Sequence, residues 1–451
     1  MFVNRKSELE FLKRKWEEKR AQLIIIYGRR RVGKTMLLKE FLKDRRGVYF
    51  LATADSMGEN LKGLGEKFVE LTGKEYFMEV KDFGRLFRYL ADEIGEERIV
   101  VILDEFQYLM SLEHGILSVL QKVWDEHLKG TNIFLVLCGS SMGMMERVTE
   151  YKSPLYGRRT GAWKVEPFDI KGIAEMFPDR SMEELVKTYA VFGGVPFYLD
   201  LVKGLSVEEA IREKVLRKGE VLYEEPEFLL REELREPRVY KLILKGLALG
   251  YETLGELVNF TGLDRGHLSR YLDILGRLGI VGYELPYEKR KRGRYFIKDN
   301  FFNFWFRFVY PNFGDLELGL VDEVWEKIEL GINAYYGTMF ERLVREMLRQ
   351  RIIDFRQKKV ARWWHKGEEI DAIAELDNGM LFVEVKWSEL GRREAERVLE
   401  RLKKKAERFE GKKKFLLIAK WIEEKGDGMM DLEDLEKAVR GWSNVTLGNR
   451  A

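Results

Sequence analysis

The chain has 451 residues, of which 45% are hydrophobic and 34% are charged, and its formal net charge is +3. This composition supplies enough apolar residues for buried cores, excludes wholesale disorder, and fits about three domains at this length. The small net charge also excludes a global electrostatic field that would by itself demand a nucleic-acid partner. A single cysteine, Cys138, excludes an internal disulfide, and no apolar run reaches membrane-spanning length. We therefore expect a soluble cytoplasmic protein, and the abundance of Lys and Glu is typical of thermophile proteins.

The first part of the chain alternates apolar runs with amphipathic stretches of helical periodicity. This alternation predicts a parallel α/β sheet. The strand candidates are Leu23–Tyr27, Val48–Ala52, Ile99–Leu103 and Ile133–Cys138.

The first of these strands runs into a loop with the spacing G-x-x-x-x-G-K-T, and a helical pattern begins directly after it. Strand, glycine-rich loop and helix in this order are typical of the phosphate-binding loop of a nucleotide site. Lys34 is expected to reach the β- and γ-phosphates, and the Thr35 hydroxyl is expected to hold Mg²⁺. The alternative is an ordinary glycine-containing turn. The predicted ATP contacts of this loop are Gly28, Arg29, Arg30, Arg31, Val32, Gly33, Lys34, Thr35 and Met36.

Acidic and hydroxyl side chains follow two further predicted strands. Asp104 and Glu105 end the apolar run from Ile99, so Asp104 can hold the Mg²⁺ shell and Glu105 can act as the general base. Ser140 and Ser141 follow the run from Ile133, and one of them is a candidate sensor of the γ-phosphate, with a plain polar turn as the alternative.

Arg158 and Arg159 follow the Pro154–Gly157 turn. A guanidinium can stabilise the charge of phosphoryl transfer, either within its own subunit or from a neighbour, which makes a homo-oligomer one expectation. Ordinary surface basicity is the alternative.

Two more segments carry a family resemblance. Residues 2–9 (FVNRKSEL) resemble the adenine-side box of AAA+ and STAND ATPases, and Phe192–Pro196 is similar to the Gly-x-Pro element of their helical lid. With the phosphate loop and Asp104, they make residues 1–220 similar to archaeal-type ATPases of the STAND division. The resemblance implies ATP as the ligand, nucleotide contacts from Val3, Arg5 and Pro196, and a switch with slow hydrolysis.

The chain after the ATPase core, predicted at residues 1–165, divides into three further parts. A helical lid and connector are predicted at 166–235, with Glu224–Pro237 as the acidic connector, and a winged-helix domain at 236–310. The last domain is predicted at 311–451.

The middle domain is predicted from a helix starting near Leu254, a helix capped by Asp264, the strand Ile280–Tyr283 and a basic tip at Lys289–Arg294. This order resembles a winged helix. If it reads DNA, its second helix offers Arg265, His267 and Arg270 to the major groove, while the tip contacts phosphates. In STAND proteins, winged helices also serve as packing pieces for the ATPase, and this alternative stays open.

The last domain carries a helix with Glu341, a strand beginning near Ile370 with Asp371, and a strand with Glu384 and Lys386 on one face. Two carboxylates and a backbone carbonyl can bind Mg²⁺, Glu341 can complete the shell, and Lys386 can activate water. Residues 335–425 resemble the PD-(D/E)xK nuclease fold, with Ile370 in the place of Pro. Some relatives of that fold only bind, so cleavage and binding both stay open.

The whole chain therefore resembles archaeal ATPases fused to a winged helix and a nuclease-like domain. The resemblance implies an ATP-controlled switch that binds DNA. It also implies Mg²⁺-dependent cleavage of DNA by the last domain as a further expectation. The alternative is a regulatory scaffold whose last domain is an inactive binding module. The lysine runs Lys403–Lys405 and Lys412–Lys414 suit a phosphate backbone, and they suit plain solvated surfaces equally well.

Overall fold

The computed structural model describes residues 3–441, so Phe2 of the N-terminal box and the end of the last predicted domain lie outside the description. Two compact units divide the chain, Met1–Pro167 and Phe168–Ala451, and each is described here by itself. The three domains predicted after residue 166 thus share one compact unit. No helix within the described residues combines the length and the apolar character needed to cross a membrane.

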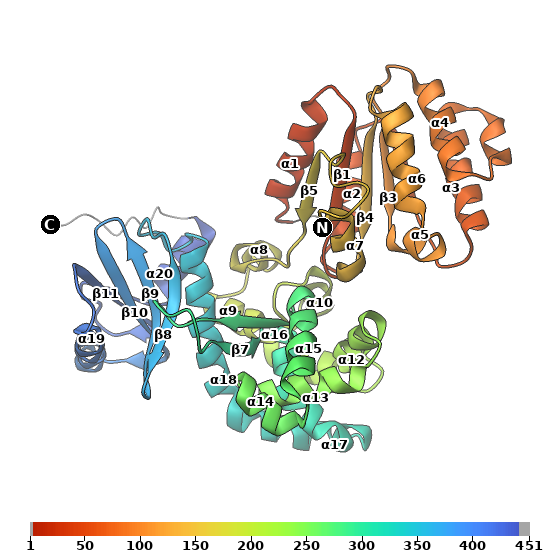
Figure 1. The fold of residues 1–451 in the computed structure, drawn as a ribbon. Coiled ribbons are helices and arrows are strands. Elements are labelled where there is room, and N and C mark those ends of the chain that lie inside the picture. Colours follow the sequence, from red (N-terminus) through yellow and green to blue (C-terminus); the bar gives the residue numbers. More distant parts are fainter. Residues whose placement is uncertain (1–2, 442–451) are drawn as a thin grey trace. The chain divides into compact units, whose positions relative to one another are not determined.

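The first unit is built on a five-stranded sheet in the order β2-β3-β4-β1-β5, and every neighbouring pair is parallel (Figure 1). The predicted parallel α/β sheet is therefore confirmed. Its strands are β1 (Gln22–Tyr27), β2 (Gly47–Leu51), β3 (Val100–Asp104), β4 (Phe134–Gly139) and β5 (Gly161–Lys164). The edge strand β5 was not predicted, because its four residues, none of them buried, form no apolar run.

Two apolar cores cover the two faces of this sheet, because successive strand residues point to opposite sides. Ile24 and Ile26 of β1 pack with α1 and α2, whereas Leu23 and Ile25 pack in the core formed with α3, α4 and α6. The helices of this unit are α1 (Lys6–Glu17), α2 (Lys34–Leu42), α3 (Met57–Thr72), η1 (Glu75–Glu79), α4 (Phe83–Ile94), α5 (Gln107–Leu112), α6 (Ile116–Val123), η2 (Trp124–Leu128) and α7 (Met142–Thr149).

The second unit opens with a helical region. It comprises α8 (Ile170–Met176), α9 (Met182–Phe192), α10 (Pro196–Leu201), α11 (Val207–Ala210), η3 (Ile211–Val215) and α12 (Val221–Glu233). The expectation of a connector at Glu224–Pro237 is wrong for most of its length, since α12 runs through it and includes Pro226. Burial of Leu222, Leu229 and Leu230 outweighs the helix-breaking tendency of proline there.

Three helices and a small antiparallel sheet follow, among them the two predicted helices, α14 and α15, and the predicted strand, β6. They are α13 (Pro237–Ala248), α14 (Leu254–Thr261), α15 (Arg265–Arg277), β6 (Val281–Glu284) and β7 (Arg294–Ile297). Asp264 caps α15 as expected, because its side chain accepts hydrogen bonds from the backbone N–H groups of Gly266 and His267.

The aromatic stretch after β7 is buried in short helices that lead into a long one. These are α16 (Asn300–Phe304), η4 (Trp305–Val309), η5 (Tyr310–Asn312), α17 (Phe313–Glu317) and α18 (Val321–Arg349).

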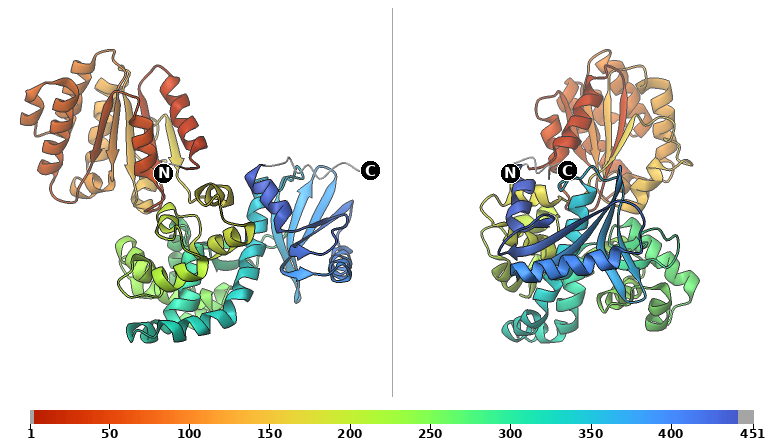
Figure 2. Two further views of the ribbon diagram at one scale, coloured as in Figure 1. Left: turned by 180° about the vertical axis from the view of Figure 1, so that it is seen from behind. Right: turned by 90° about the vertical axis from the view of Figure 1, so that its left-hand side faces the viewer.

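A second five-stranded sheet, in the order β12-β11-β10-β9-β8, ends the described chain. Its elements are β8 (Val360–His365), β9 (Glu368–Leu376), β10 (Gly379–Leu390), α19 (Arg392–Ala406), β11 (Lys413–Ile422), β12 (Met429–Met430) and α20 (Leu432–Arg440). The pairs β8–β9 and β9–β10 are antiparallel, whereas β10–β11 is parallel. The helices α18 and α19 lie on opposite faces of this sheet (Figure 2).

Candidate nucleotide site and carboxylate cluster

The loop from Gly28 to Gly33 joins β1 to α2 at the carboxyl end of the parallel sheet, where ligands of such sheets bind. A Cβ atom at Gly28 would lie 2.4 Å from the carbonyl oxygen of Val165, so the backbone passes too close for any larger residue. Gly33, at the N-cap of α2, has φ +91°, a left-handed conformation that favours glycine. The two glycines of the predicted motif are therefore needed for different reasons: close backbone packing at Gly28 and a left-handed backbone at Gly33.

Lys34 points back over this loop. Its Nζ donates hydrogen bonds to the carbonyl oxygens of Gly28 at 2.9 Å and Arg29 at 3.0 Å, and the side chain is buried. A buried ammonium needs such partners, and phosphate oxygens are stronger ones. Its predicted contact with the β- and γ-phosphates stays a prediction.

Asp104 at the end of β3 is the centre of the predicted Mg²⁺ site. Its Oδ2 accepts hydrogen bonds from Thr35 Oγ1 and from the Tyr49 hydroxyl, both at 2.7 Å, and its Oδ1 accepts one from the Glu105 backbone N–H at 2.9 Å. Burial acts to raise the pKa of Asp104, but hydrogen bonds from Cys138, Tyr49 and Thr35 outweigh burial and lower the pKa. An ionised carboxylate beside the Thr35 hydroxyl fits a Mg²⁺ shell.

Glu105 has a positive φ of 52°, an uncommon and strained conformation for a non-glycine residue. Its Oε2 accepts hydrogen bonds from Ser140 Oγ at 2.7 Å and from Gln107 Nε2. The structure thus brings together Glu105 at the end of β3 and Ser140 at the end of β4, and their roles in catalysis and sensing stay predictions. The sequence analysis missed Gln107 and Tyr49, since a lone polar residue in a helix or strand pattern carries no signal of its own.

The N-terminal segment is attached to the phosphate loop through Arg5. Its guanidinium is 5% exposed and donates to the carbonyl oxygens of Val32 at 2.6 Å and Glu166 at 2.8 Å, and to Glu8 at 2.8 Å. Arg5 therefore orients the loop from behind, and Val3 lies two residues before it. In the loop itself, Arg30 donates to the Tyr108 hydroxyl at 3.5 Å and Arg31 has φ +70°.

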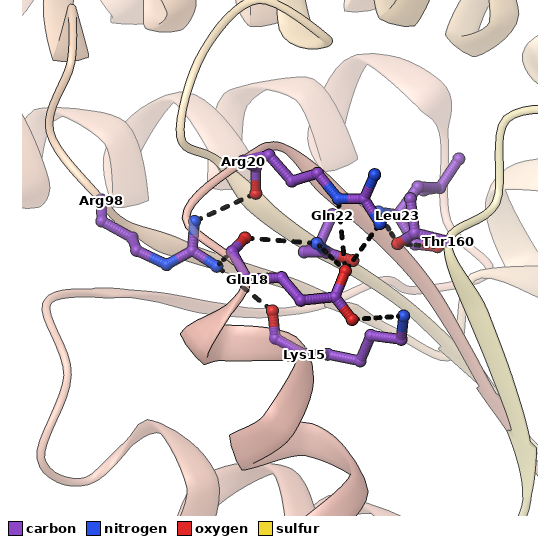
Figure 3. A network of polar contacts seen from close by, with 7 residues as sticks. All are labelled: Lys15, Glu18, Arg20, Gln22, Leu23, Arg98 and Thr160. Carbon is purple, nitrogen blue, oxygen red and sulfur yellow. Dashed lines mark hydrogen bonds and ion pairs between the residues drawn. The ribbon is translucent and has the colours of Figure 1, made fainter.

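Arg158 and Arg159 lie in the segment before β5, and their action on nucleotide, in their own subunit or in a neighbouring one, stays a prediction. Thr160, the next residue, pairs with Leu23 near the amino end of β1, inside the polar network around Glu18 (Figure 3). The amino end of β1 is the end opposite to the phosphate loop, which follows the carboxyl end of this strand. Arg158 is bound there by Asp125, at 2.7 to 3.1 Å.

Arg159 lies over the Tyr156 ring, with its guanidinium carbon 5.2 Å from the ring centre. An action of either arginine on a neighbouring subunit stays a prediction. Pro196 begins α10 in the second unit, and its contact with nucleotide also stays a prediction.

The second unit gathers the four predicted residues of the last domain. Asp371 on β9 accepts a hydrogen bond from the Val385 backbone N–H on β10 at 2.8 Å, and the Lys386 ammonium lies 2.8 Å from Glu384. Lys405 of α19 also donates to Glu384, at 3.2 Å. Sequence reasoning assigned Lys405 only to a lysine run.

Negative charge crowds this cluster. Burial first, and then the charge of Asp371, raise the pKa of Glu341 to about 7. Burial and the charge of Glu384 likewise raise the pKa of Asp371, although Lys386 opposes the shift. Within residues 3–441, no three His, Cys, Asp or Glu side chains form a group arranged to hold a metal ion, so a cation here would use carboxylates together with backbone oxygen.

Comparison with known proteins places this chain in a family. Residues 2–202 match the family described as "ATPase domain predominantly from Archaea", and residues 305–398 match a family of archaeal and bacterial proteins of unknown function. The protein MJECL04 of Methanocaldococcus jannaschii is 38% identical over 450 residues, covering 96% of this chain and 100% of its own length.

Two further likenesses are shorter or more distant. The M. jannaschii protein MJ0423, described as an ATP-binding protein, is 72% identical over 46 residues, which are 10% of this chain and 78% of its own length. The Walker-type ATPase PABY2304 of Pyrococcus abyssi superposes with a TM-score of 0.49 at 23% identity, covering 68% of this chain and 96% of its own.

The first unit is thus an archaeal-type ATPase domain with a phosphate-binding loop. The chain as a whole belongs to the family of MJECL04.

Replacing Lys34 with alanine removes the ammonium that the loop carbonyls position. A charge-assisted hydrogen bond contributes about 1.5–3 kcal/mol, so ATP should bind about 10- to 100-fold more weakly. Calorimetric titration with Mg·ATP measures this change. Lys43→Ala, at the exposed end of the same helix, is the matched control, and equal affinities of the two variants would refute the assigned loop.

Glu341 makes stability depend on pH in a defined direction. Because its pKa rises from 4.5 in the unfolded chain to about 7 in the folded one, the folded state binds the extra proton between these values. The free energy of unfolding should therefore fall as pH rises from about 4.5 to about 7. Glu341→Gln should remove this fall in urea unfolding series, whereas the exposed Glu326→Gln on the same helix should keep it.

Proposed function

We propose that this protein is an ATP-binding and ATP-hydrolysing switch of the AAA+/STAND type whose second unit binds DNA. One observation carries the ATPase part: Thr35 Oγ1 lies 2.7 Å from the buried, ionised Asp104 directly beside the Lys34 loop. Bound Mg·ATP supplies the phosphoryl group and the cation that neutralises its charge. Thr35 and Asp104 would hold that cation.

Glu105 is the proposed general base. Ser140 and Gln107 both bind its Oε2, so the carboxylate is oriented through one oxygen while the other can accept a proton from water. Gln107 and Ser140 are also hydrogen-bonded to each other, at 3.2 Å. A movement of Ser140 on β4 would therefore change the hydrogen bonds that orient Glu105 on β3. This linkage supports the proposed role of Ser140 as a γ-phosphate sensor.

DNA binding is proposed for the helices α13 to α15 with the β6–β7 hairpin, as a winged helix. Arg265, His267 and Arg270 are exposed along α15, as a recognition helix requires. The hairpin tip exposes Arg290, Lys291 and Arg292. ATP would act by favouring one arrangement of the two units over another.

Mg²⁺-dependent DNA cleavage is a second candidate function, in a PD-(D/E)xK-like last domain. The observation that favours it is the crowding of Glu341, Asp371 and Glu384, which raises the pKa of the first two and which a cation would relieve. The element order α18, β8, β9, β10, α19, β11 supports the same reading. Lys386 would then orient the attacking water.

The alternative is a regulatory scaffold whose last domain binds without cutting. Its support is that Lys386 and Lys405 already neutralise Glu384. The proposal also includes a homo-oligomer in which Arg158 and Arg159 of one subunit approach the nucleotide of the next.

Neutralising the hairpin tip should weaken DNA binding through lost phosphate contacts. In Arg290→Gln/Lys291→Gln/Arg292→Gln, the slope of log affinity against log salt should fall by about 3, roughly one for each lost contact. Fluorescence anisotropy with duplex DNA at several salt concentrations measures the slope. If the tip only packs or is solvated, the slope will equal that of Lys13→Gln/Lys43→Gln/Lys62→Gln, a matched set of exposed lysines in the first unit.

Cleavage is tested with plasmid DNA and Mg²⁺ or Mn²⁺, with and without ATP. Asp371→Ala and Lys386→Ala should each reduce the cleavage rate at least about 100-fold, the range of a lost catalytic group. Asp377→Ala, in the exposed turn of the same hairpin, should cleave normally. A wild-type protein that never cuts, or cuts as fast in both variants, leaves the binding module as the function of this domain.

A further inference from the structure

The second unit contains a cavity of about 360 Å³ outside both sites described above. Its walls come from the end of α13, from β7, from η4, from α18 and from β8. A volume in this range suits a small organic or inorganic ligand.

Basic side chains dominate the lining. Four arginines are balanced by glutamates: Arg294 by Glu252 and Glu369, Arg342 by Glu346, Arg349 by Glu284, and Arg362 by Glu369. These five ion pairs join four arginines to four glutamates, so they leave the walls close to neutral and fix their shape.

Three further cations of the lining, Lys298, Arg307 and Arg345, form no ion pair within the part of the chain that the structure describes. Lys298 and Arg307 are exposed at the rim, whereas Arg345 is only 8% exposed. The cavity therefore carries an excess of three positive charges.

The deep end of the cavity has unused hydrogen-bonding capacity. Arg345 has five N–H donors, and in the described structure it makes one hydrogen bond, to the carbonyl oxygen of Asp371 at 3.0 Å. The Nε of Arg362 is buried without a hydrogen-bond partner. Buried donors and cations of this kind are costly unless an anion or water satisfies them.

We propose that this cavity binds a phosphate-bearing anion, with Arg345 at its base and Lys298 and Arg307 at its mouth. A phosphate monoester has two negative charges and several acceptor oxygens. It therefore matches both the excess of positive charge and the unused N–H donors of Arg345 and Arg362. The ligand chemistry is a terminal phosphate, supplied either by a free phosphate or nucleotide or by the end of a nucleic-acid strand.

This site goes beyond the proposed function, because it uses neither the phosphate loop nor the carboxylates as ligands. Arg345 nevertheless touches the Asp371 backbone, so an occupied cavity would stiffen the strand that carries Asp371. The cavity thereby gives the last domain a phosphate sensor of its own.

The test uses the full chain saturated with Mg·ADP, so that the phosphate loop is already filled. Four probes are titrated: inorganic phosphate, AMP, a short 5′-phosphorylated oligonucleotide, and the same oligonucleotide with a 5′-hydroxyl. Lys298→Gln/Arg307→Gln removes two exposed cations without touching the buried base of the cavity. Lys62→Gln/Lys171→Gln, exposed in α3 and α8, is the charge-matched control.

We expect saturable binding of phosphate and AMP, or a clear preference for the 5′-phosphorylated strand, and the two results identify the two sources. Either should weaken at least about tenfold in the cavity variant, since each lost charge-assisted contact is worth about a factor of 10. The control variant should bind as wild type. Absence of binding, equal affinity for the two oligonucleotides with no phosphate binding, or equal affinity of the variant and the wild type would each overturn the proposal. None of these results depends on ATP hydrolysis or DNA cleavage.

Discussion

The buried carboxylate of Asp104 is the constraint on which the first unit depends. It lies at the end of the interior strand β3 with no exposed surface, yet it stays ionised because four hydrogen bonds offset its burial. Those bonds come from four different places in the chain, at Thr35, Tyr49, Glu105 and Cys138. Satisfying this one charge therefore fixes the start of α2, the register of β2 and the tip of β3 together.

The parts of the site that depend on local order were predictable from the sequence. The loop from Gly28 to Thr35 is one continuous segment with two special glycines, and the strand ends at Asp104 and Ser140 converge because parallel strands share a carboxyl edge. The confirmed part of the fold was predictable for the same reason, since β1 to β4 each carry an apolar run that is typical of a strand.

The parts that depend on long-range packing were not predictable. Arg5 reaches Val32 across 27 residues, and no sequence pattern announces such a contact. The position of Arg158 depends on its ion pair with Asp125, 33 residues earlier in the chain. Its basic motif alone therefore did not predict where Arg158 lies relative to the sheet. The acidic, proline-containing stretch of α12 was predicted as a connector, but burial of its leucines makes it helical.

Buried carboxyl groups have pKa values shifted in opposite directions in the two units. The first uses neutral hydrogen-bond donors to keep a carboxylate ionised. The second crowds carboxyl groups until their pKa values rise, and arginine and lysine side chains gather in a nearby cavity. Perturbed and unbalanced charge of this kind marks functional sites. In the proposed switch, triphosphate and cation act on the first arrangement, and anionic ligands act on the second.

The most direct measurement is hydrogen–deuterium exchange of the whole chain with and without a non-hydrolysable ATP analogue and Mg²⁺. The account predicts that the ligand slows exchange at residues 28–36 and 104–107, and that amides of the second unit change their exchange as well. Identical exchange rates throughout both units, at ligand concentrations up to the millimolar range, would contradict it.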